Sequence, residues 1–181
     1  MRKGQLYYVM GPSGAGKDSV LAWVRLHGVS NDVLCAHRYI TRPADAGGEN
    51  HVALSEEEFL LRAKRGLFAL TWQAHGLRYG IGREIQHWLE LGAQVLVNGS
   101  RDAYAQAHER FPAVRPVVIT ASQETIAARL AARGRESAVE IAERLARREA
   151  YQAPADALII HNDGSLIDAG VRLLKAITDQ H

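Results

Sequence analysis

The sequence predicts an α/β fold in which a parallel five-stranded sheet carries helices on both faces. Two observations lead to this prediction. Short apolar runs alternate with segments of helical periodicity along the chain, and consecutive parallel strands need helical crossovers between them. In addition, a length of 181 residues with 47% apolar content fits one domain with its own core.

The first expected strand is the apolar run Leu6–Met10, and the stretch directly after it carries the strongest signal in the chain. Its pattern G-x-x-x-x-G-K is typical of a phosphate-binding loop that opens a helix. Glycines let backbone N–H groups turn towards a phosphate, the helix N-terminus adds its dipole, and Lys17 would reach the β- and γ-phosphates. The pattern therefore predicts a P-loop NTPase fold, and a glycine-rich turn without a ligand is the alternative. The residues expected to bind ATP are Gly11, Pro12, Ser13, Gly14, Ala15, Gly16, Lys17, Asp18 and Ser19.

Asp18 stands where this loop usually has a serine or threonine whose hydroxyl binds Mg²⁺. A carboxylate is a harder and stronger oxygen ligand than a hydroxyl, so Asp18 is the expected metal ligand. The alternative is an acid at the helix N-terminus that only complements the dipole. Ser19 retains a hydroxyl that can contact the α-phosphate.

The remaining elements follow from the same two patterns. The other expected strands are short apolar runs: Val33–Ala36, Gln94–Asn98, Val114–Ile119 and Ala157–His161. The expected helices are Lys17–Leu26, Ser55–Arg65, Arg83–Leu91, Asp102–Arg110, Gln123–Arg133, Ala138–Tyr151 and Ser165–Ile177. Ser55 with Glu58, and Thr120 with Gln123, have the spacing of capping boxes at helix starts.

Two segments interrupt the alternation. Residues 37–82 contain little core strand but many Gly, Arg, His and aromatic residues, and residues 133–138 are rich in arginine. In a phosphotransferase such segments are natural places for an acceptor-binding subdomain and a lid. We therefore expect one domain over residues 1–181, made of a core (1–36, 83–132 and 152–181), an acceptor-binding insert (37–82) and an Arg-rich lid (133–151).

Four arginines form a candidate cluster around this lid: Arg129, Arg133, Arg135 and Arg144. The first two lie four residues apart on one helix face, and the last lies on the next helix. A hinge flanked by arginines can close over a transferring phosphoryl group and neutralise its oxygens. The expected catalytic residues are therefore Lys17, Arg129, Arg133 and Arg144. The alternative is a solvated helix pair whose arginines pair with neighbouring glutamates.

The insert and one strand end offer cationic and polar groups for an anionic acceptor. Pro43 breaks helix, so Arg42 lies on an extended segment or loop. Residues that follow a strand of a parallel sheet face its ligand. The expected acceptor-binding residues are Arg38, Arg42, His51, Tyr79, Asn98, Ser100 and Arg101. The alternatives are that the charges lie on an exposed loop without a ligand, and that Tyr79 only packs within the subdomain.

Composition narrows the class of partner. A formal net charge of +2 argues against a general nucleic-acid binder, and no apolar stretch approaches a membrane span. Eighteen arginines against four lysines favour recognition of a phosphate-rich small molecule, although a G+C-rich genome gives the same bias. Cys35, the one cysteine, lies in an apolar run and is expected in the core of a protein from a reducing compartment. Cytoplasm is the expected location.

Over nearly its whole length the chain resembles the guanylate kinase family of P-loop nucleoside monophosphate kinases. The motifs that carry the resemblance are Gly11–Lys17, Thr41-Arg42-Pro43 with Gly48-Glu49, Ser55–Phe59, Tyr79-Gly80, Arg129-Leu130, Arg133-Gly134, Arg144-Leu145 and Asn162-Asp163. The resemblance implies ATP as co-substrate, Mg²⁺, and a lid that carries these arginines. It also implies that Asn162 lies near the adenine and ribose of ATP.

The departures from that family lie on the acceptor side. Guanylate kinases have a glutamate that reads the guanine edge, and Thr71 stands in its place. Asp45 aligns near the second acceptor arginine, His51 near a tyrosine, and Ile81 replaces a serine or threonine. Together with Asp18 these departures resemble an offshoot of the family, the ribose 1,5-bisphosphate phosphokinases, which the segments His37–Arg42, Gly48–His51 and Val97–Arg101 also resemble.

The resemblance to this offshoot implies transfer of the γ-phosphoryl group of ATP to the 1-phosphate of ribose 1,5-bisphosphate, in phosphonate catabolism. The products would be 5-phospho-α-D-ribose 1-diphosphate and ADP. Such an acceptor needs no strong general base, because a phosphate dianion is already the nucleophile at neutral pH. Its two phosphates need two cationic pockets, which we assign to Arg38 with Arg42 and to Tyr79 with residues 98–101.

Three alternatives stay open at this point. The chain could be a guanylate kinase that phosphorylates GMP, or a catalytically inactive guanylate-kinase-like module that binds proteins. It could also phosphorylate a hydroxyl, with Asp45 or Glu49 as the base. The expected partner is a small sugar phosphate rather than nucleic acid or a membrane, and the sequence leaves open whether the chain is a monomer or a homodimer.

Overall fold

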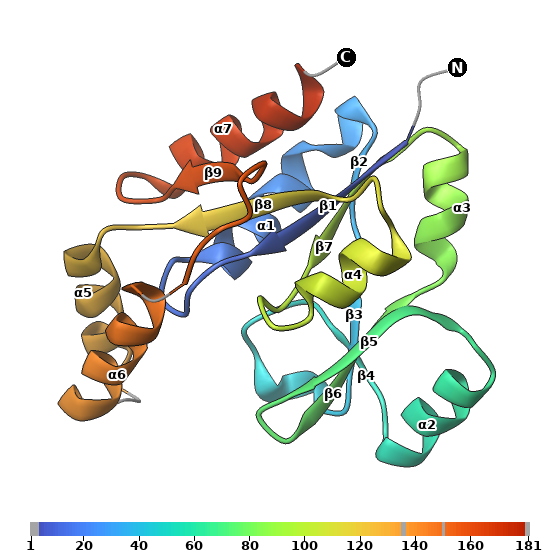
Figure 1. The fold of residues 1–181 in the computed structure, drawn as a ribbon, viewed down its shortest axis with the longest axis horizontal. Coiled ribbons are helices and arrows are strands. Elements are labelled where there is room, and N and C mark those ends of the chain that lie inside the picture. The colour runs from blue at the N-terminus through green and yellow to red at the C-terminus, as the bar shows by residue number, and fades with distance from the viewer. Residues whose placement is uncertain (1–3, 135–136, 150, 180–181) are drawn as a thin grey trace.

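The computed structural model describes residues 4–134, 137–149 and 151–179, and it contains two sheets (Figure 1). The larger sheet is parallel and has the strand order β2-β7-β1-β8-β9. Its strands are β1 (Gln5–Met10), β2 (Val33–Cys35), β7 (Gln94–Asn98), β8 (Arg115–Thr120) and β9 (Leu158–His161). The predicted five-stranded parallel sheet is confirmed, and each strand matches its apolar run to within one residue.

Helices cover both faces of this sheet. On one face α1 (Lys17–His27) and α7 (Leu166–Thr178) pack in the cluster that contains Tyr7 and Val9 of β1. On the other face α3 (Glu84–Glu90) and α4 (Tyr104–Arg110) pack in the cluster that contains Tyr8 and Met10. Successive residues of β1 therefore point to two equally buried faces, which is why this strand is an unbroken apolar run.

A separate helix pair projects from one side of the sheet, at the left of Figure 1. It consists of α5 (Gln123–Arg133), which follows β8, and α6 (Ala138–Glu149). Ile141 and Leu145 of α6 pack against a small apolar cluster that contains Ile126 and Leu130 of α5. The pair thus has its own core, which is distinct from the two clusters on the sheet faces.

The structure confirms one predicted helix cap and corrects the other. Ser55 accepts a hydrogen bond from the Glu58 N–H at 3.1 Å at the start of α2 (Glu56–Lys64). The predicted cap of α5 was wrong, because Thr120 is the last residue of β8 and Ser122 accepts from the Thr125 N–H instead. An N-cap side chain reaches the N–H group three residues on, so the residue directly before the helix makes this bond.

The insert contains the main difference from the sequence prediction. Its residues form a second, four-stranded sheet of order β4-β3-β6-β5, with α2 beside it. The strands are β3 (Arg38–Ile40), β4 (Val52–Ala53), β5 (Phe68–Ala74) and β6 (Leu77–Gly82), and two short 3-10 turns, η1 (Val29–Asn31) and η2 (Ala44–Ala46), precede β2 and β4. Phe59 and Phe68 stack at 4.7 Å between ring centroids and give this sheet a small aromatic core. β3 and β4 are too short to leave a periodicity in the sequence. β5 and β6 are longer, and their apolar residues at every second position, on either side of a turn at His75-Gly76, are a hairpin signal that sequence reasoning missed.

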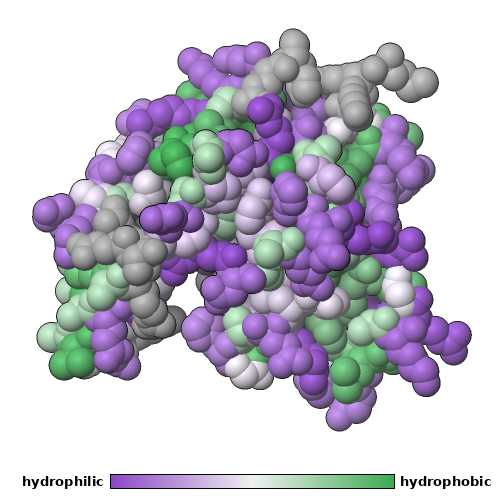
Figure 2. Space-filling view, in the orientation of Figure 1, coloured by the Kyte–Doolittle hydropathy of each residue, from purple (hydrophilic) through white to green (hydrophobic). Residues whose placement is uncertain are grey.

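The insert and the α5–α6 pair project from the large sheet as two separate lobes (Figure 1). Figure 2 shows a hollow between these lobes, with mainly hydrophilic side chains on the side of the insert. No helix in the described residues is both long enough and apolar enough to cross a membrane.

Candidate active site

The glycine-rich loop joins β1 to α1 at the carboxyl end of the central strand. Gly16 is the N-cap of α1 and has a left-handed backbone conformation, with φ 80° and ψ 22°. It has no side chain to cap the helix, so the N–H groups of the first turn stay available to a ligand. Available N–H groups and the positive end of an eleven-residue helix are suited to binding an anion here.

Lys17, Asp18 and Asn98 form a connected cluster beside this loop. The Lys17 ammonium lies 3.2 Å from Asp18 Oδ1 and also donates to Asn98 Oδ1, while Asn98 Nδ2 donates to Asp18 Oδ1 at 2.9 Å. β1 and β7 are neighbours in the sheet, so their carboxyl ends bring these three residues together. The structure thus groups two predicted ATP-binding residues with a residue that the sequence assigned to the acceptor.

The charges in this cluster are set by burial and by mutual contact. Burial lowers the pKa of Lys17, against the opposing attraction of Asp18. Burial alone would raise the pKa of Asp18, but the Lys17 charge and the Asn98 hydrogen bond hold it below its usual range. The side chain of Asp18 is 45% exposed, so an ionised carboxylate oxygen is accessible from solvent.

Arg129 and Asn162 contact the backbone of the phosphate loop. Arg129 donates to the Ala15 carbonyl at 3.3 Å and to the Asn162 carbonyl at 2.8 Å, and Asn162 Nδ2 donates to the same Ala15 oxygen at 2.8 Å. Asn162 is buried, and its Oδ1 has no hydrogen-bond partner among the described residues. The structure therefore places Arg129 on the backbone of the phosphate loop, whereas the sequence assigned it to the lid.

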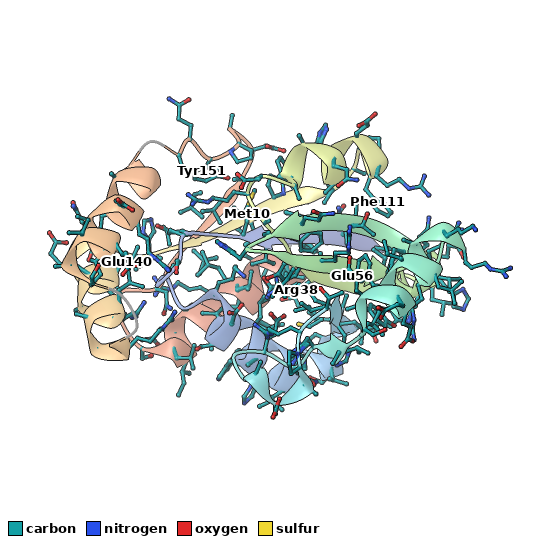
Figure 3. All side chains as sticks on the ribbon, turned by 90° about the horizontal axis from the view of Figure 1, so that it is seen from below. Met10, Arg38, Glu56, Phe111, Glu140 and Tyr151 are labelled. Carbon is teal, nitrogen blue, oxygen red and sulfur yellow. The ribbon has the colours of Figure 1, made fainter. Side chains whose placement is uncertain are left out.

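The other lid arginines have different positions. Arg144 of α6 donates to Ser13 Oγ at 2.7 Å, so it connects the α5–α6 pair directly to the loop. Arg133 is exposed at the end of α5, where Gly134 ends the helix with φ 65°. Arg135 lies outside the described residues. In Figure 3, Glu140 marks the α5–α6 pair, well away from Arg38 in the insert.

A second charged cluster lies in the insert. Arg38 forms a two-pronged ion pair with Glu49, whose Oε1 also lies 3.7 Å from an Arg42 nitrogen. The Arg38 and Glu49 side chains are only 13% and 11% exposed. The Arg38 guanidinium also covers the ring of Tyr79 at 5.0 Å from its centroid, and Trp72 stacks on that ring at 5.4 Å.

Glu49 is the residue of this cluster that sequence reasoning missed. It entered the sequence analysis through the Gly48-Glu49 motif and as an alternative base, but not as the partner of two arginines. Because its single charge offsets one of theirs, Arg38, Arg42 and Glu49 together retain one net positive charge. A carboxylate within eleven residues of both arginines was the available signal.

His51 is buried within its own loop. Its Nε2 lies 3.1 Å from the Pro43 carbonyl, and its Nδ1 lies 3.2 Å from an Arg42 nitrogen and 3.3 Å from the Glu49 carbonyl. These contacts tie together the two ends of the segment that carries Arg42. The ring therefore supports this segment rather than projecting into open space.

The remaining predicted acceptor residues are divided between two places. Tyr79 belongs to the insert cluster, as described above. Ser100 is held through its backbone, since the Tyr8 hydroxyl accepts from its N–H at 3.1 Å and donates to its carbonyl at 2.9 Å. Arg101 covers the ring of Tyr151 at 4.7 Å from its centroid, and Tyr151 in turn donates to Met10 Sδ (Figure 3).

The described residues contain no group of three or more His, Cys, Asp or Glu side chains that could hold a metal ion. A metal at this loop would therefore depend on Asp18 together with ligands from elsewhere. Mg²⁺ is commonly bound in this way, through one or two carboxylates plus the phosphates of a substrate. The exposed, ionised carboxylate of Asp18 fits that arrangement.

Comparison with curated proteins found close relatives over almost the whole chain. The chain is 54% identical over 174 residues to "Ribose 1,5-bisphosphate phosphokinase PhnN" of Chromobacterium violaceum, and the aligned region covers 96% of this chain and 94% of that protein. It is 57% identical over 171 residues to the protein of the same name from Laribacter hongkongensis. That alignment covers 94% of this chain but only 42% of the longer protein.

Comparison with solved structures places the fold. A guanylate kinase from Anaplasma phagocytophilum matches with a TM-score of 0.71 at 19% identity, over 99% of this chain and 88% of that one. At this identity the likeness shows the fold alone. No protein-family model matches the chain.

Proposed function

This chain belongs to the ribose 1,5-bisphosphate phosphokinase PhnN family, and from that premise we propose that it phosphorylates ribose 1,5-bisphosphate with ATP. An oxygen of the 1-phosphate attacks the γ-phosphorus of ATP and the bond to the β-γ bridging oxygen breaks. ADP leaves with that electron pair, and 5-phospho-α-D-ribose 1-diphosphate is formed. The observation that carries the proposal is the 54% identity to a protein of that name over 94% of its length.

The loop side of the site supports the role of ATP in this proposal. Backbone N–H groups of the loop and the Lys17 ammonium would bind the β- and γ-phosphates. Arg144 reaches the loop from α6 and would add a second cation, with exposed Arg133 as a further candidate from the same lobe. Arg129 and Asn162 would act indirectly, by fixing the Ala15 carbonyl and with it the shape of the loop.

Asp18 is the residue that would hold Mg²⁺, with phosphate oxygens as further ligands. Such an ion would supply positive charge that neutralises the phosphates of ATP. The nucleophile needs no base from the protein, because the acceptor phosphate is a dianion at neutral pH. Catalysis then consists of alignment and charge neutralisation by groups already in place.

The acceptor side favours a sugar phosphate over GMP. Arg38 and Arg42 would bind a phosphate of the acceptor, with Glu49 fixing both guanidinium groups. Thr71 lies on β5 opposite Gly80, and a hydroxyl cannot accept two N–H donors of guanine as a carboxylate does. We also propose the core, insert and lid boundaries given above, a cytoplasmic location, and a place in phosphonate catabolism.

The test is a comparison of acceptors in an assay that couples ADP release to NADH oxidation. With ATP and Mg²⁺, we expect kcat/KM for ribose 1,5-bisphosphate to exceed that for GMP by about 10³-fold or more. ATP without an acceptor is the control for simple hydrolysis. A preference for GMP would make the protein a guanylate kinase, and absence of turnover with every acceptor would favour a binding module.

A further inference from the structure

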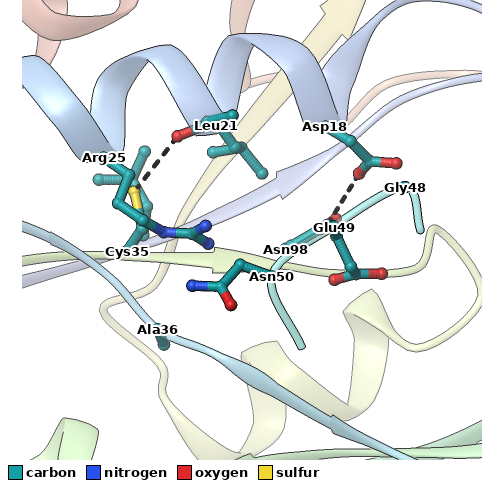
Figure 4. Close-up of a pocket in the computed structure, with 11 residues that line it drawn as sticks. Asp18, Leu21, Arg25, Cys35, Ala36, Gly48, Glu49, Asn50 and Asn98 are labelled. Carbon is teal, nitrogen blue, oxygen red and sulfur yellow. Dashed lines mark hydrogen bonds between the residues drawn. The ribbon is translucent and has the colours of Figure 1, made fainter. Parts of the chain in front are cut away.

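A small cavity lies between α1, the strands β2 and β7, and the segment Gly48–Asn50 of the insert (Figure 4). Its volume is about 40 Å³, which is enough for a few water molecules. Asp18 and Asn98 line the end next to the phosphate loop, and Arg25 and Cys35 line the other end. The cavity therefore begins at the candidate active site and extends along α1 away from it.

Arg25 is an unpartnered cation in the wall of this cavity. Its Nε is buried without a hydrogen-bond partner, and within the described residues the guanidinium forms no ion pair. Buried N–H donors almost always have a partner, so such a group indicates a missing one. Figure 4 shows the guanidinium directed towards Asn50, whose Nδ2 lies 3.0 Å from His37 Nε2 on the outer side.

The other groups around the cavity leave this charge without compensation. Glu49 lines the cavity, but its carboxylate is held by Arg38 and Arg42. Burial raises the pKa of the Cys35 thiol to about 11, with the Arg25 charge acting in the opposite direction, so that wall is neutral at physiological pH. A guanidinium that forms no ion pair is suited to a phosphate, which it binds through two parallel hydrogen bonds.

Cations lie at both ends of this stretch of α1, Lys17 at the phosphate loop and Arg25 farther along the helix. Asp18 and Arg25 are seven residues apart, which is close to two full turns, so both lie on the same side of the helix about 10 Å apart. A phosphate that receives the γ-phosphoryl group must lie at the Asp18 end, beside Lys17. A second phosphate on the same small sugar would then lie towards Arg25.

We propose that Arg25, with Asn50, binds the acceptor phosphate that does not react, which is the 5-phosphate of ribose 1,5-bisphosphate. This inference rests on the proposed function. The sugar needs more room than the present cavity offers, so the segment that carries Gly48 must move outward to admit it. A side chain at Gly47 or Gly48 would have no neighbour within 4 Å, so packing does not oppose that movement. The ion pairs of Glu49 and the bond from Arg42 to the Gly47 carbonyl would have to shift with the segment.

The test compares two acceptors in wild-type protein and in Arg25 variants. Ribose 1-phosphate has the reacting phosphate but lacks the distal one. We expect Arg25→Gln to lower kcat/KM for ribose 1,5-bisphosphate by about 10- to 100-fold. For ribose 1-phosphate we expect the same substitution to lower kcat/KM by no more than about three-fold, since no distal phosphate is bound. Arg172→Gln, an exposed arginine on α7, is the matched control and leaves both acceptors unaffected.

Arg25→Lys keeps the charge but loses the two-pronged geometry, so we expect an intermediate loss confined to the bisphosphate. Thermal unfolding shows whether Arg25→Gln is folded. If it is not, Arg25→Lys is the variant on which the comparison of the two acceptors is made. Equal losses on both acceptors, or no loss on the bisphosphate, overturn the role of Arg25 while leaving the proposed function intact. Failure of wild-type protein to phosphorylate either acceptor instead refutes the proposed function, and the inference with it.

Discussion

Two charged clusters face the candidate active site, and they are built in different ways. Lys17, Asp18 and Asn98 come from the ends of neighbouring strands in the large sheet, so the core fixes their positions. Arg38 and Glu49 come from a short strand and a loop of the insert, and they hold each other in place. The positions of the first cluster thus follow from the core of the protein, whereas those of the second depend on the contacts that its own members make.

Of the substitutions in the two clusters, that of Lys17 is expected to have the largest effect on turnover. Lys17→Met removes the cation next to the transferring group, and we expect kcat to fall by about 10³-fold, because no other described side chain replaces a buried charge at that point. Lys64→Met, on the exposed side of α2, is the matched control and keeps wild-type turnover. Turnover of the Lys17 variant within ten-fold of wild type would remove the first cluster from the mechanism.

Glu49 tests whether the insert cluster depends on mutual ion pairing. Glu49→Gln leaves two partly buried guanidinium groups without their carboxylate, and we expect the free energy of unfolding to fall by about 3 kcal/mol in urea titrations. KM for the acceptor should rise by about ten-fold while KM for ATP is unchanged, since only the second cluster is disturbed.

The matched control is Glu58→Gln, which removes an exposed pair with Arg62 one helical turn away. Such pairs contribute about 0.5 kcal/mol or less, so little change is expected. Equal effects of the two substitutions would mean that burial does not distinguish the insert cluster from an ordinary surface pair.

Substitution of one glycine in the phosphate loop and one in the insert compares the backbone constraints of these two regions. Gly16 in the phosphate loop and Gly66 in the insert both have positive φ, at 80° and 67°. A Cβ on Gly16 would lie 2.5 Å from Asn162 Nδ2, whereas a Cβ on Gly66 would have no neighbour within 4 Å. We expect Gly16→Ala to cost about 2 kcal/mol of stability and to raise KM for ATP, and Gly66→Ala to cost about 1 kcal/mol without a kinetic effect. Similar losses in the two variants would show that contact with Asn162 does not constrain the loop.

The same comparison explains what could be predicted from the sequence. In the core, continuous apolar runs and one loop pattern determine strands, helices and the position of Lys17, because burial on both faces leaves a strong signal. In the insert, β3 and β4 are too short for periodicity. The hairpin of β5 and β6 did leave alternating apolar positions around His75-Gly76, and sequence reasoning missed that signal. The sequence showed its arginines but not which acid pairs with them.

Long-range side-chain contacts account for the remaining gaps. Arg129 has the spacing of a lid arginine, but its contacts to Ala15 and Asn162 join residues that are 114 and 33 positions away. Arg25 has no motif at all and stands out only because its buried Nε lacks a partner next to a cavity. Such features follow from the packing of distant segments, which a single sequence does not encode in a readable pattern.

The most direct test of the central claim is phosphorus NMR of a reaction that contains the protein, magnesium-ATP and ribose 1,5-bisphosphate. We predict that the signal of the 1-phosphate is replaced by two coupled resonances of a diphosphate, while the γ-phosphate of ATP is lost and ADP accumulates in equal amount. An unchanged sugar bisphosphate, with ATP either intact or converted only to ADP and inorganic phosphate, would contradict the account.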